Sequence, residues 1–285
     1  MPRFLLALLI GLLALAGAAC GSDDEEEPAA KSTPAAADAC APDQLALLEP
    51  GTLTVGTDKP AYPPYFEDDD PTNGEGFESA VAYAIADQLG FSDDQVEWVV
   101  VPFNNSYAPG PKDFDFDINQ ISVTPEREGS VTFSDGYYDV SQALVVNKET
   151  PIADATSIAD LKPFQLGVQI GTTSLDMITE VIQPDAQPRV FDRSVDVIQA
   201  LNNGQIDGYV VDAPTAYVNV LIGQAENGVV VGQFPEQGEH FGLVFEQDNP
   251  LVECVNLAIA ALEADGSLQA LQDEWLADLT YPVLQ

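Results

Sequence analysis

Apolar and polar residues alternate along some stretches of the chain, whereas in other stretches the apolar residues recur every four positions. The stretch "GTLTVGTD" alternates, which predicts a strand that ends at Asp58. The stretch "GFESAVAYAIADQLGF" repeats its apolar residues at four-residue spacing, which predicts an amphipathic helix that stops at Gly90. A second strand is expected at "VEWVVVPF", so that strand, helix and strand form a βαβ unit.

Similar patterns continue to the end of the chain and indicate two α/β blocks, at about 52–146 and 149–240. Further strands are predicted at "FDFDINQISV", "SQALVVNK", "FQLGVQIG", "IDGYVVD" and "HFGLVFE". Further helices are predicted at "TTSLDMITEVI", "SVDVIQALNNG" and the C-terminal "NPLVECVNLAIAALEADG" and "SLQALQDEWLADL". Because strands and helices alternate, the expected fold class is α/β.

Composition narrows the possible functions. The 285 residues include 47 acidic and 9 basic side chains, a formal net charge of −38, and a hydrophobic content of 46%, which is enough for packed cores. Nucleic acid is not an expected partner because phosphate binding requires basic patches, and we interpret the acids as a solvated acidic surface. The single histidine has no nearby Cys or His, and we find no phosphate-binding or dinucleotide-binding motif, so neither metal nor cofactor is expected.

The N-terminus carries a targeting pattern. Arg3 precedes a short apolar run, which is typical of a secretory signal peptide at 1–19. The stretch "AGAAC" resembles a lipobox, in which Cys20 would carry a lipid and become the mature N-terminus. Gly17 stands where this motif usually has an aliphatic residue, and ordinary cleavage that releases a soluble protein is the alternative. Residues 20–39 are acidic and rich in Pro and Ala, which predicts a flexible, lipid-anchored tether.

Two more cysteines follow. Cys40 begins the expected folded body, and Cys254 lies in an apolar helix near the C-terminus. A secreted compartment permits a disulfide, and we expect these two residues to pair and to join the two ends of the chain. Chain entropy alone would give so long a loop roughly 4 kcal/mol or more of stabilisation. The alternative is two buried free thiols.

Several stretches together resemble one protein family. They are "GTLTVGTD", "YPPYF", "GFESAVAYAIADQLG", "ISVTPEREGSVTFSDGYY", "LGVQIGTTS" and "IDGYVVDAP". From Thr52 onward the chain is similar to the extracellular solute-binding proteins of family 3, the polar amino acid receptors of ABC importers. The resemblance implies a two-lobed type 2 periplasmic-binding-protein fold with a ligand cleft. It also implies two crossover strands, at about 143–148 and 241–246.

The resemblance further implies how the chain is divided and what it does. Lobe 1 would comprise residues 40–145 and 245–285, and lobe 2 would comprise residues 146–244. The lobes would close around a polar amino acid, and the protein would deliver it as a monomer to an ABC permease outside the cytoplasm. Two alternatives stay open: a dehydratase-like enzyme of the same fold, and a ligand-binding receptor that serves no importer.

A free α-amino acid carries a carboxylate and an ammonium on one carbon, so its site needs a planar cation and an anion. Arg127 in "TPEREGS" matches the family's arginine, whose rigid fork binds a carboxylate through two parallel hydrogen bonds. Asp212 in "VDAP" matches the family's ammonium acceptor. The alternatives are a surface ion pair for Arg127 and a solvent-facing strand end for Asp212.

Eight further residues complete the candidate site. Ser122 matches a family hydroxyl beside the ligand carboxylate, and Thr173 in "GTTS" could bind an anion, cap a helix, or do both. Asp58 could meet a polar or cationic ligand side chain, or form an Asx turn. Tyr62 and Phe103 stand where aromatic residues of the family sandwich the ligand. Asn119 and Gln120 stand where many relatives have small residues, and Gln169 stands at a variable position that we interpret as setting selectivity.

One stretch departs from the family pattern. The family continues a helix where this chain has "APGPK" at 108–112. Gly110 and Pro111 are expected to break that helix.

Overall fold

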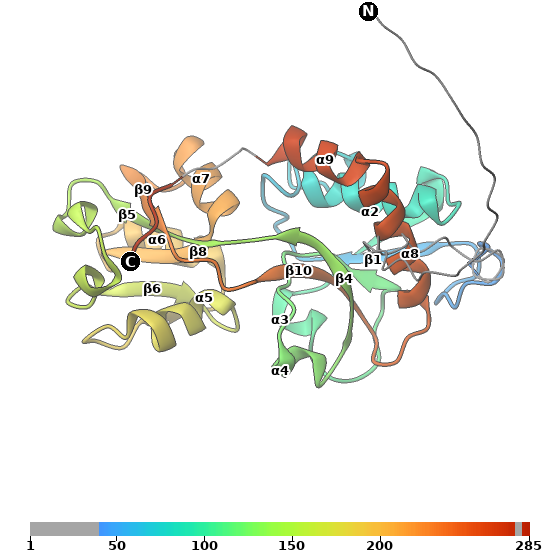
Figure 1. Cartoon of the computed structure of the whole chain (residues 1–285), viewed down its shortest axis with the longest axis horizontal. Helices are drawn as coiled ribbons and strands as arrows, with labels where there is room; N and C mark the ends of the chain where they lie inside the picture. Colours follow the sequence, from blue (N-terminus) through green and yellow to red (C-terminus); the bar gives the residue numbers. More distant parts are fainter. Residues whose placement is uncertain (1–39, 277–280) are drawn as a thin grey trace, which may run out of the picture.

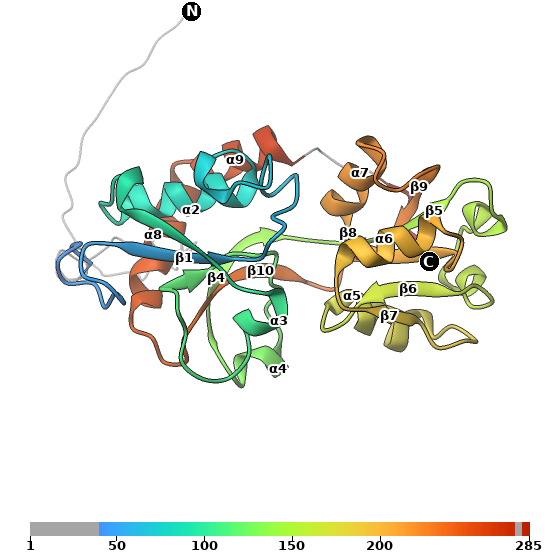
Figure 2. The same ribbon diagram turned by 180° about the vertical axis from the view of Figure 1, so that it is seen from behind.

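The computed structural model describes residues 40–276 and 281–285. The predicted signal peptide at 1–19, the lipidation of Cys20 and the tether at 20–39 lie outside the described residues and stay predictions. The described chain forms two lobes, each built on a five-stranded sheet with helices packed around it (Figures 1 and 2). The predicted α/β, two-lobed class is confirmed.

The sheet of lobe 1 is mixed. Its strands are β1 (Leu53–Thr57), β2 (Val96–Val100), β3 (Phe116–Asp117), β4 (Thr132–Asp139) and β10 (His240–Phe245). They lie in the order β2-β1-β3-β10-β4. β1 runs parallel to β2 and β3, whereas β10 runs antiparallel to β3 and β4. The strand expected over "FDFDINQISV" is reduced to the two residues of β3, and β4 has no counterpart among the predicted strands.

The sheet of lobe 2 has the same number of strands. They are β5 (Gln142–Asn147), β6 (Leu166–Gln169), β7 (Arg189–Phe191), β8 (Gly208–Asp212) and β9 (Gly228–Gln233), in the order β7-β6-β8-β5-β9. β6 is parallel to β7 and β8, and β5 is antiparallel to β8 and β9. Leu144 and Val146 of β5 pack in one core cluster, and Ala143 and Val145 pack in another. Because successive side chains of a strand point to opposite faces, both faces of this sheet are covered, which explains the continuous apolar run of β5.

The helices cover the sheets. Lobe 1 contains α2 (Phe77–Gln88), α3 (Phe103–Ser106), α4 (Pro125–Glu128), α8 (Leu251–Ala264) and α9 (Ser267–Trp275), and lobe 2 contains α5 (Thr173–Asp176), α6 (Ser194–Asn202) and α7 (Ala213–Leu221). α5 continues directly into a π-helix, η5 (Met177–Ile182). Short 3-10 turns are η1 (Pro71–Asn73), η2 (Asp93–Gln95), η3 (Pro151–Asp154) and η4 (Ile158–Leu161). α2, α8 and α9 pack against one another on one side of lobe 1 (Figure 1).

α2 shows how the predicted four-residue spacing is used. Phe77, Val81 and Ile85 are completely buried against the lobe 1 sheet and the C-terminal helices. The helix begins after Gly76, whose φ is +94°. A Cβ at this position would lie 2.5 Å from the carbonyl oxygen of Tyr65, so only glycine fits the entry to the helix.

The chain changes lobe at other residues than expected. β4 of lobe 1 is followed by β5 of lobe 2 after only Val140 and Ser141, and the chain returns to lobe 1 through residues 234–239, between β9 and β10. Each strand pairs only within its own sheet, so β5 lies wholly in lobe 2 and β10 wholly in lobe 1. The strands expected to cross at 143–148 and 241–246 therefore follow the two crossings, and the expected boundaries at 145 and 245 move toward the N-terminus.

The C-terminal residues also differ from the expected division of the chain into two lobes. Residues 245–285 were assigned to lobe 1, and α8 and α9 do pack there. Leu284, however, is buried in a core cluster of lobe 2, and Val283 forms a bridge with Gln233 at the end of β9. Residues 281–285 therefore belong to lobe 2 (Figure 1).

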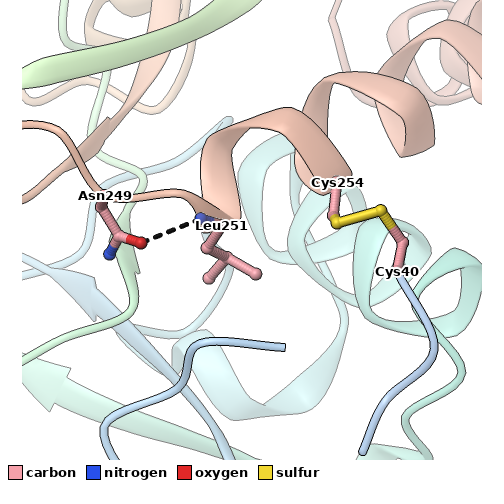
Figure 3. Close-up of a disulfide and its surroundings, with 4 residues drawn as sticks. All are labelled: Cys40, Asn249, Leu251 and Cys254. Carbon is pink, nitrogen blue, oxygen red and sulfur yellow. Dashed lines mark hydrogen bonds between the residues drawn. A yellow bond between two sulfur atoms is a disulfide. The ribbon is translucent and has the colours of Figure 1, made fainter. Parts of the chain in front are cut away.

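A disulfide joins Cys40 to Cys254, as the sequence predicts (Figure 3). Cys254 lies in the first turn of α8, close to Leu251, whose N–H donates to Asn249 Oδ1 at 2.9 Å in the turn that leads into the helix. The structure thus has the disulfide rather than the alternative of two free thiols. The bond fastens the start of the described chain to lobe 1.

Across residues 40–276 and 281–285, we find no helix with the length and apolar character that a membrane span requires.

Candidate functional site

The ends of several strands meet between the lobes. Asp58 follows β1 and Asn119 lies just beyond β3, in a set of parallel strands. Gln169 ends β6 and Asp212 ends β8, which are parallel in the other sheet. Because parallel strands share one carboxyl-terminal edge, each sheet presents its polar residues at a single edge. The two edges face one cavity.

All ten predicted ligand-binding residues line this cavity. They are Asp58, Tyr62, Phe103, Asn119, Gln120, Ser122 and Arg127 from lobe 1, and Gln169, Thr173 and Asp212 from lobe 2. The lining also includes residues that the sequence did not single out as ligand contacts: Thr172, Ser174, Ser194, Ile198, Val211, Thr215 and Asn219. The cavity wall is mostly polar and comes from both lobes.

Arg127 is held by the short helix α4. Thr124 caps this helix, its Oγ1 accepting the N–H of Arg127 at 3.3 Å, and Pro125 occupies the first turn. The guanidinium lies 4.5 Å from the ring centre of Tyr107. One terminal nitrogen donates to the carbonyl of Ser122 at 2.7 Å, and the other donates across the cleft to the carbonyl of Gly171 at 2.8 Å.

Among the residues that the structure describes, Arg127 has no acidic partner, although the chain is rich in acids. Its side chain is 7% exposed, which excludes a surface ion pair. Within the described residues, ion pairs closer than 4.0 Å are limited to Lys59–Asp69 and Arg193–Asp196. Burial lowers the pKa of Arg127, but arginine keeps its proton in proteins. Two of its five N–H groups are used by the two carbonyls, so the rest are available to an incoming carboxylate.

Asp212 lies at the junction of β8 and α7, where Pro214 starts the helix. Its Oδ1 accepts a hydrogen bond from Gln142 Nε2 at 2.6 Å. Burial, and next the negative charge of Glu239, raise the pKa of Asp212 to about 8. No basic side chain of a described residue lies within 4.0 Å of this carboxyl group, and it faces a cavity that can receive a cation.

Ser122 and Thr173 stand on opposite sides of the cleft, and both hydroxyls donate to the same oxygen of Glu239, each at 2.6 Å. The sequence-based expectation gave Ser122 and Thr173 to the ligand carboxylate. In the structure their hydroxyl protons are already engaged by Glu239, a residue that sequence reasoning did not identify. It lies in the crossing segment 234–239, where no local pattern marks it.

Asp58, Tyr62 and Gln169 form another part of the wall, together with Ser194. One carboxylate oxygen of Asp58 accepts the N–H of Lys59 at 2.6 Å, and the other accepts the N–H of Phe103 at 3.2 Å. The Asx turn considered as the alternative does not form, because the residue two positions on is Pro60, which has no N–H to donate. Ser194 donates to the side-chain oxygen of Gln169, which leaves the amide nitrogen of Gln169 free to turn toward a ligand. Asp58 thus holds a loop and still presents a carboxylate to the cavity.

Asn119 and Gln120 change the pocket in different ways. The side-chain nitrogen of Asn119 is buried and has no protein partner among the described residues, so it is a free donor at the cavity wall. Gln120 adopts a left-handed backbone with φ of +48° and turns its amide toward the buried carboxyl group of Glu78. Burial raises the pKa of Glu78 to about 7. A left-handed backbone is the conformation that glycine adopts most readily, so glycine would also suit the Gln120 position.

The expected break at 108–112 is confirmed, because α3 ends at Ser106 and no helix follows before α4. The shortened element still serves the site. Tyr107, the residue after α3, stacks on Arg127, and its hydroxyl donates to Asn104 Oδ1 and lies 3.1 Å from the carbonyl oxygen of Gly171. This tyrosine is a further site residue that sequence reasoning missed, since a lone aromatic beside a loop is more often core.

Comparison with known proteins agrees with this architecture. The family described as bacterial extracellular solute-binding proteins, family 3, matches residues 53–278. The chain is 25% identical to the arginine-binding extracellular protein ArtP of Bacillus subtilis (strain 168), over 96% of this chain and 98% of that protein. It is 30% identical to the L-cystine-binding protein TcyJ of Escherichia coli (strain K12), over 82% of this chain and 86% of that protein. An ancestral arginine-binding protein bound to arginine superimposes with a TM-score of 0.68 at 32% identity, over 80% of this chain and 99% of that chain.

A two-lobed fold with a cavity between its two sheets, lined by polar residues of both lobes, is typical of proteins that bind a small solute. The chain belongs to the bacterial extracellular solute-binding proteins, family 3. This membership implies a location outside the cytoplasm. The relatives named above are described as binding proteins rather than as enzymes.

Proposed function

We propose that this protein is the substrate-binding component of an ABC importer and that it binds a polar amino acid between its two lobes. Arg127 binds the α-carboxylate, and Asp212 binds the α-ammonium. The observation that carries the proposal is a buried arginine that has no acidic partner within residues 40–276 and 281–285 and that faces the same cavity as a buried carboxylate of the opposite lobe. A zwitterion on one carbon satisfies both groups and draws the two lobes together.

The side chain of the ligand is proposed to be cationic. Asp58 presents a carboxylate to the cavity, whereas Arg127 is the one basic residue in the described lining. Two of the relatives compared above are named for binding arginine. Gln169 and the free amide nitrogen of Asn119 add polar contacts for the rest of the side chain.

The proposal also covers the attachment of the protein to the membrane and the delivery of its ligand. Cys20 carries the lipid anchor, residues 20–39 tether the folded body to the membrane, and the monomer passes its ligand to a permease. We propose that the protein binds its ligand without transforming it, because the relatives named above are described as binding proteins.

A ligand screen tests the proposal. The purified protein is melted in the presence of each of the twenty amino acids, with dicarboxylates as controls. A ligand at 100 times its dissociation constant adds about 2.7 kcal/mol to the free energy of unfolding, so arginine or lysine is expected to raise the melting temperature clearly. Asp58→Asn is expected to lose this preference for cationic amino acids while it still binds glutamine. If no amino acid raises the melting temperature, the proposed function is wrong.

Ligand binding is expected to release a proton. With its pKa raised to about 8, Asp212 carries a proton in the free protein at pH 6.5, and the ligand ammonium requires the ionised form. Affinity is therefore expected to rise about tenfold between pH 6.5 and 8, since each unit below the pKa costs up to tenfold. Calorimetry in two buffers of different ionisation enthalpy measures the released proton directly, and a release close to zero at pH 6.5 would contradict the assignment.

Other charged groups near Asp212 bear on this result. Glu239 and Glu78 contribute negative charge and Arg127 contributes positive charge. Glu78 also has a raised pKa, but it is buried and already accepts hydrogen bonds from Gln120 and Tyr137. Glu78→Gln is therefore the control, and proton release is expected to persist in this variant.

A further inference from the structure

Glu239 does not line the cavity, yet it contacts two residues that do. Its Oε1 accepts the hydroxyls of Ser122 and Thr173, each at 2.6 Å. Ser122 belongs to lobe 1 and Thr173 to lobe 2, so a single carboxylate oxygen joins the two walls of the cleft. The residue stands immediately before β10, in the segment that returns the chain to lobe 1, and its carbonyl accepts the N–H of Val140 in the other crossing segment at 3.0 Å.

The amide of Gln142 fixes the position of this carboxylate. Ser174 donates its hydroxyl to Gln142 Oε1 at 2.6 Å, so the amide nitrogen must point the other way. That nitrogen lies 3.2 Å from both oxygens of Glu239 and 2.6 Å from Asp212 Oδ1. Gln142 is 2% exposed and Ser174 is 5% exposed, so water competes little for these contacts. In the described part of the chain, no basic side chain lies within 4.0 Å of either carboxyl group.

The direction of these hydrogen bonds decides what the ligand meets. A hydroxyl has one proton and two lone pairs, and a carboxylate oxygen can only accept. When Ser122 and Thr173 give their protons to Glu239, their oxygens can offer only lone pairs to the cavity. Lone pairs attract an ammonium and repel a carboxylate. Together with Asp212, they form a group of acceptors drawn from both lobes.

We propose that Glu239 is a positioning residue that takes up the hydroxyl protons of Ser122 and Thr173 and thereby converts both hydroxyls into acceptors for the ligand ammonium. The inference rests on the proposed function, because it concerns the amino group of an amino acid ligand. It leaves recognition of the α-carboxylate to Arg127. It also reverses the expectation from the sequence, in which both hydroxyls donate to the carboxylate.

Three probes separate the two ends of the ligand. They are L-arginine, agmatine, which lacks the carboxylate, and 5-guanidinopentanoate, which lacks the α-amino group. In Glu239→Ala the two hydroxyl protons become free. Agmatine is then expected to bind about tenfold more weakly than to the wild type, and 5-guanidinopentanoate about threefold more tightly, in line with the usual value of single hydrogen bonds. A general loss of structure would lower the affinity for both agmatine and 5-guanidinopentanoate. Opposite changes in the two affinities therefore identify the positioning role.

Two matched variants complete the experiment. In Glu239→Gln the side-chain oxygen still accepts both hydroxyls, so 5-guanidinopentanoate is expected to gain nothing. This variant also keeps the test valid if the alanine variant fails to fold. Glu236→Ala removes an exposed acid from the same segment and is expected to leave the affinities for all three probes unchanged within twofold.

The outcomes are distinguishable. Suppose that the wild type binds L-arginine, and that Glu239→Ala lowers the affinity for agmatine and for 5-guanidinopentanoate alike. The positioning role is then wrong and the proposed function stands. Tighter binding of 5-guanidinopentanoate to Glu239→Gln than to the wild type would also contradict it, because charge alone would then be the cause. If the wild type binds none of the three probes, binding of a cationic amino acid is wrong and the inference falls with it.

Discussion

Replacing Arg127 with alanine is expected to weaken binding of the amino acid ligand by about 3 kcal/mol, or more than 100-fold. The carboxylate of the ligand would enter a buried cleft without a cation to meet it. Lysine at this position is expected to recover only part of the loss, because an ammonium cannot make two parallel hydrogen bonds and stacks less well on Tyr107. Titration calorimetry with L-arginine measures both variants.

Arg127 also joins the lobes through Gly171, so its loss has a second effect that must be separated from the first. Agmatine makes this separation, since it has no carboxylate. Its affinity is expected to change by less than threefold in Arg127→Ala, whereas the affinity for L-arginine falls more than 100-fold. Arg189→Ala, at an exposed residue of β7 that does not line the cavity, removes the same charge and serves as control. A loss of less than threefold for L-arginine would contradict carboxylate recognition by Arg127.

Much of the site could be predicted because its main residues lie at the ends of apolar runs. Asp58 and Asp212 each lie at the end of a strand whose pattern can be recognised in the sequence. The resemblance to the family then identified Arg127 as the residue that binds the ligand carboxylate. In α/β sheets the carboxyl ends of parallel strands converge whatever the loops contain. Residues so placed, such as Asp58, Gln169 and Asp212, reach the same cavity by topology alone. Those in loops and short helices, such as Arg127 and Thr173, could be predicted only from the resemblance to the family.

The contacts that organise the site could not be predicted in this way. Glu239 and Ser122 are 117 residues apart, and no periodicity of either segment shows that their side chains meet. β4 was missed because glycine interrupts its pattern, and the structure gives the reason for that glycine. A Cβ at Gly136 would lie 2.9 Å from the ring of His240 on the neighbouring strand β10. The sequence thus predicts which residues reach the cavity, whereas the roles of hydroxyls and amides depend on partners distant in the chain.

Breaking the Cys40–Cys254 disulfide is expected to lower the free energy of unfolding by about 4 kcal/mol, because the bond closes a very long loop in the unfolded chain. The two cysteines are separated by 214 positions, so the restriction acts on nearly the whole folded body. For a chain of this size, the melting temperature of the double variant Cys40→Ser, Cys254→Ser is expected to fall by about 10 °C. Thermal and urea unfolding of the oxidised, the reduced and the double-variant proteins measure the effect.

This loss of stability is expected to leave ligand affinity unchanged within twofold, because neither cysteine lines the cavity and both belong to lobe 1. The reduced wild type and the double variant should agree, since both lack the bond and retain small polar side chains. A single variant, Cys254→Ser, is the control for side-chain packing against α8, and it should be as unstable as the double variant. Free thiols at Cys40 and Cys254 in unfolded, unreduced protein would show that the bond does not form. A large loss of affinity on reduction would instead show that the disulfide helps to hold lobe 1 in its ligand-binding shape.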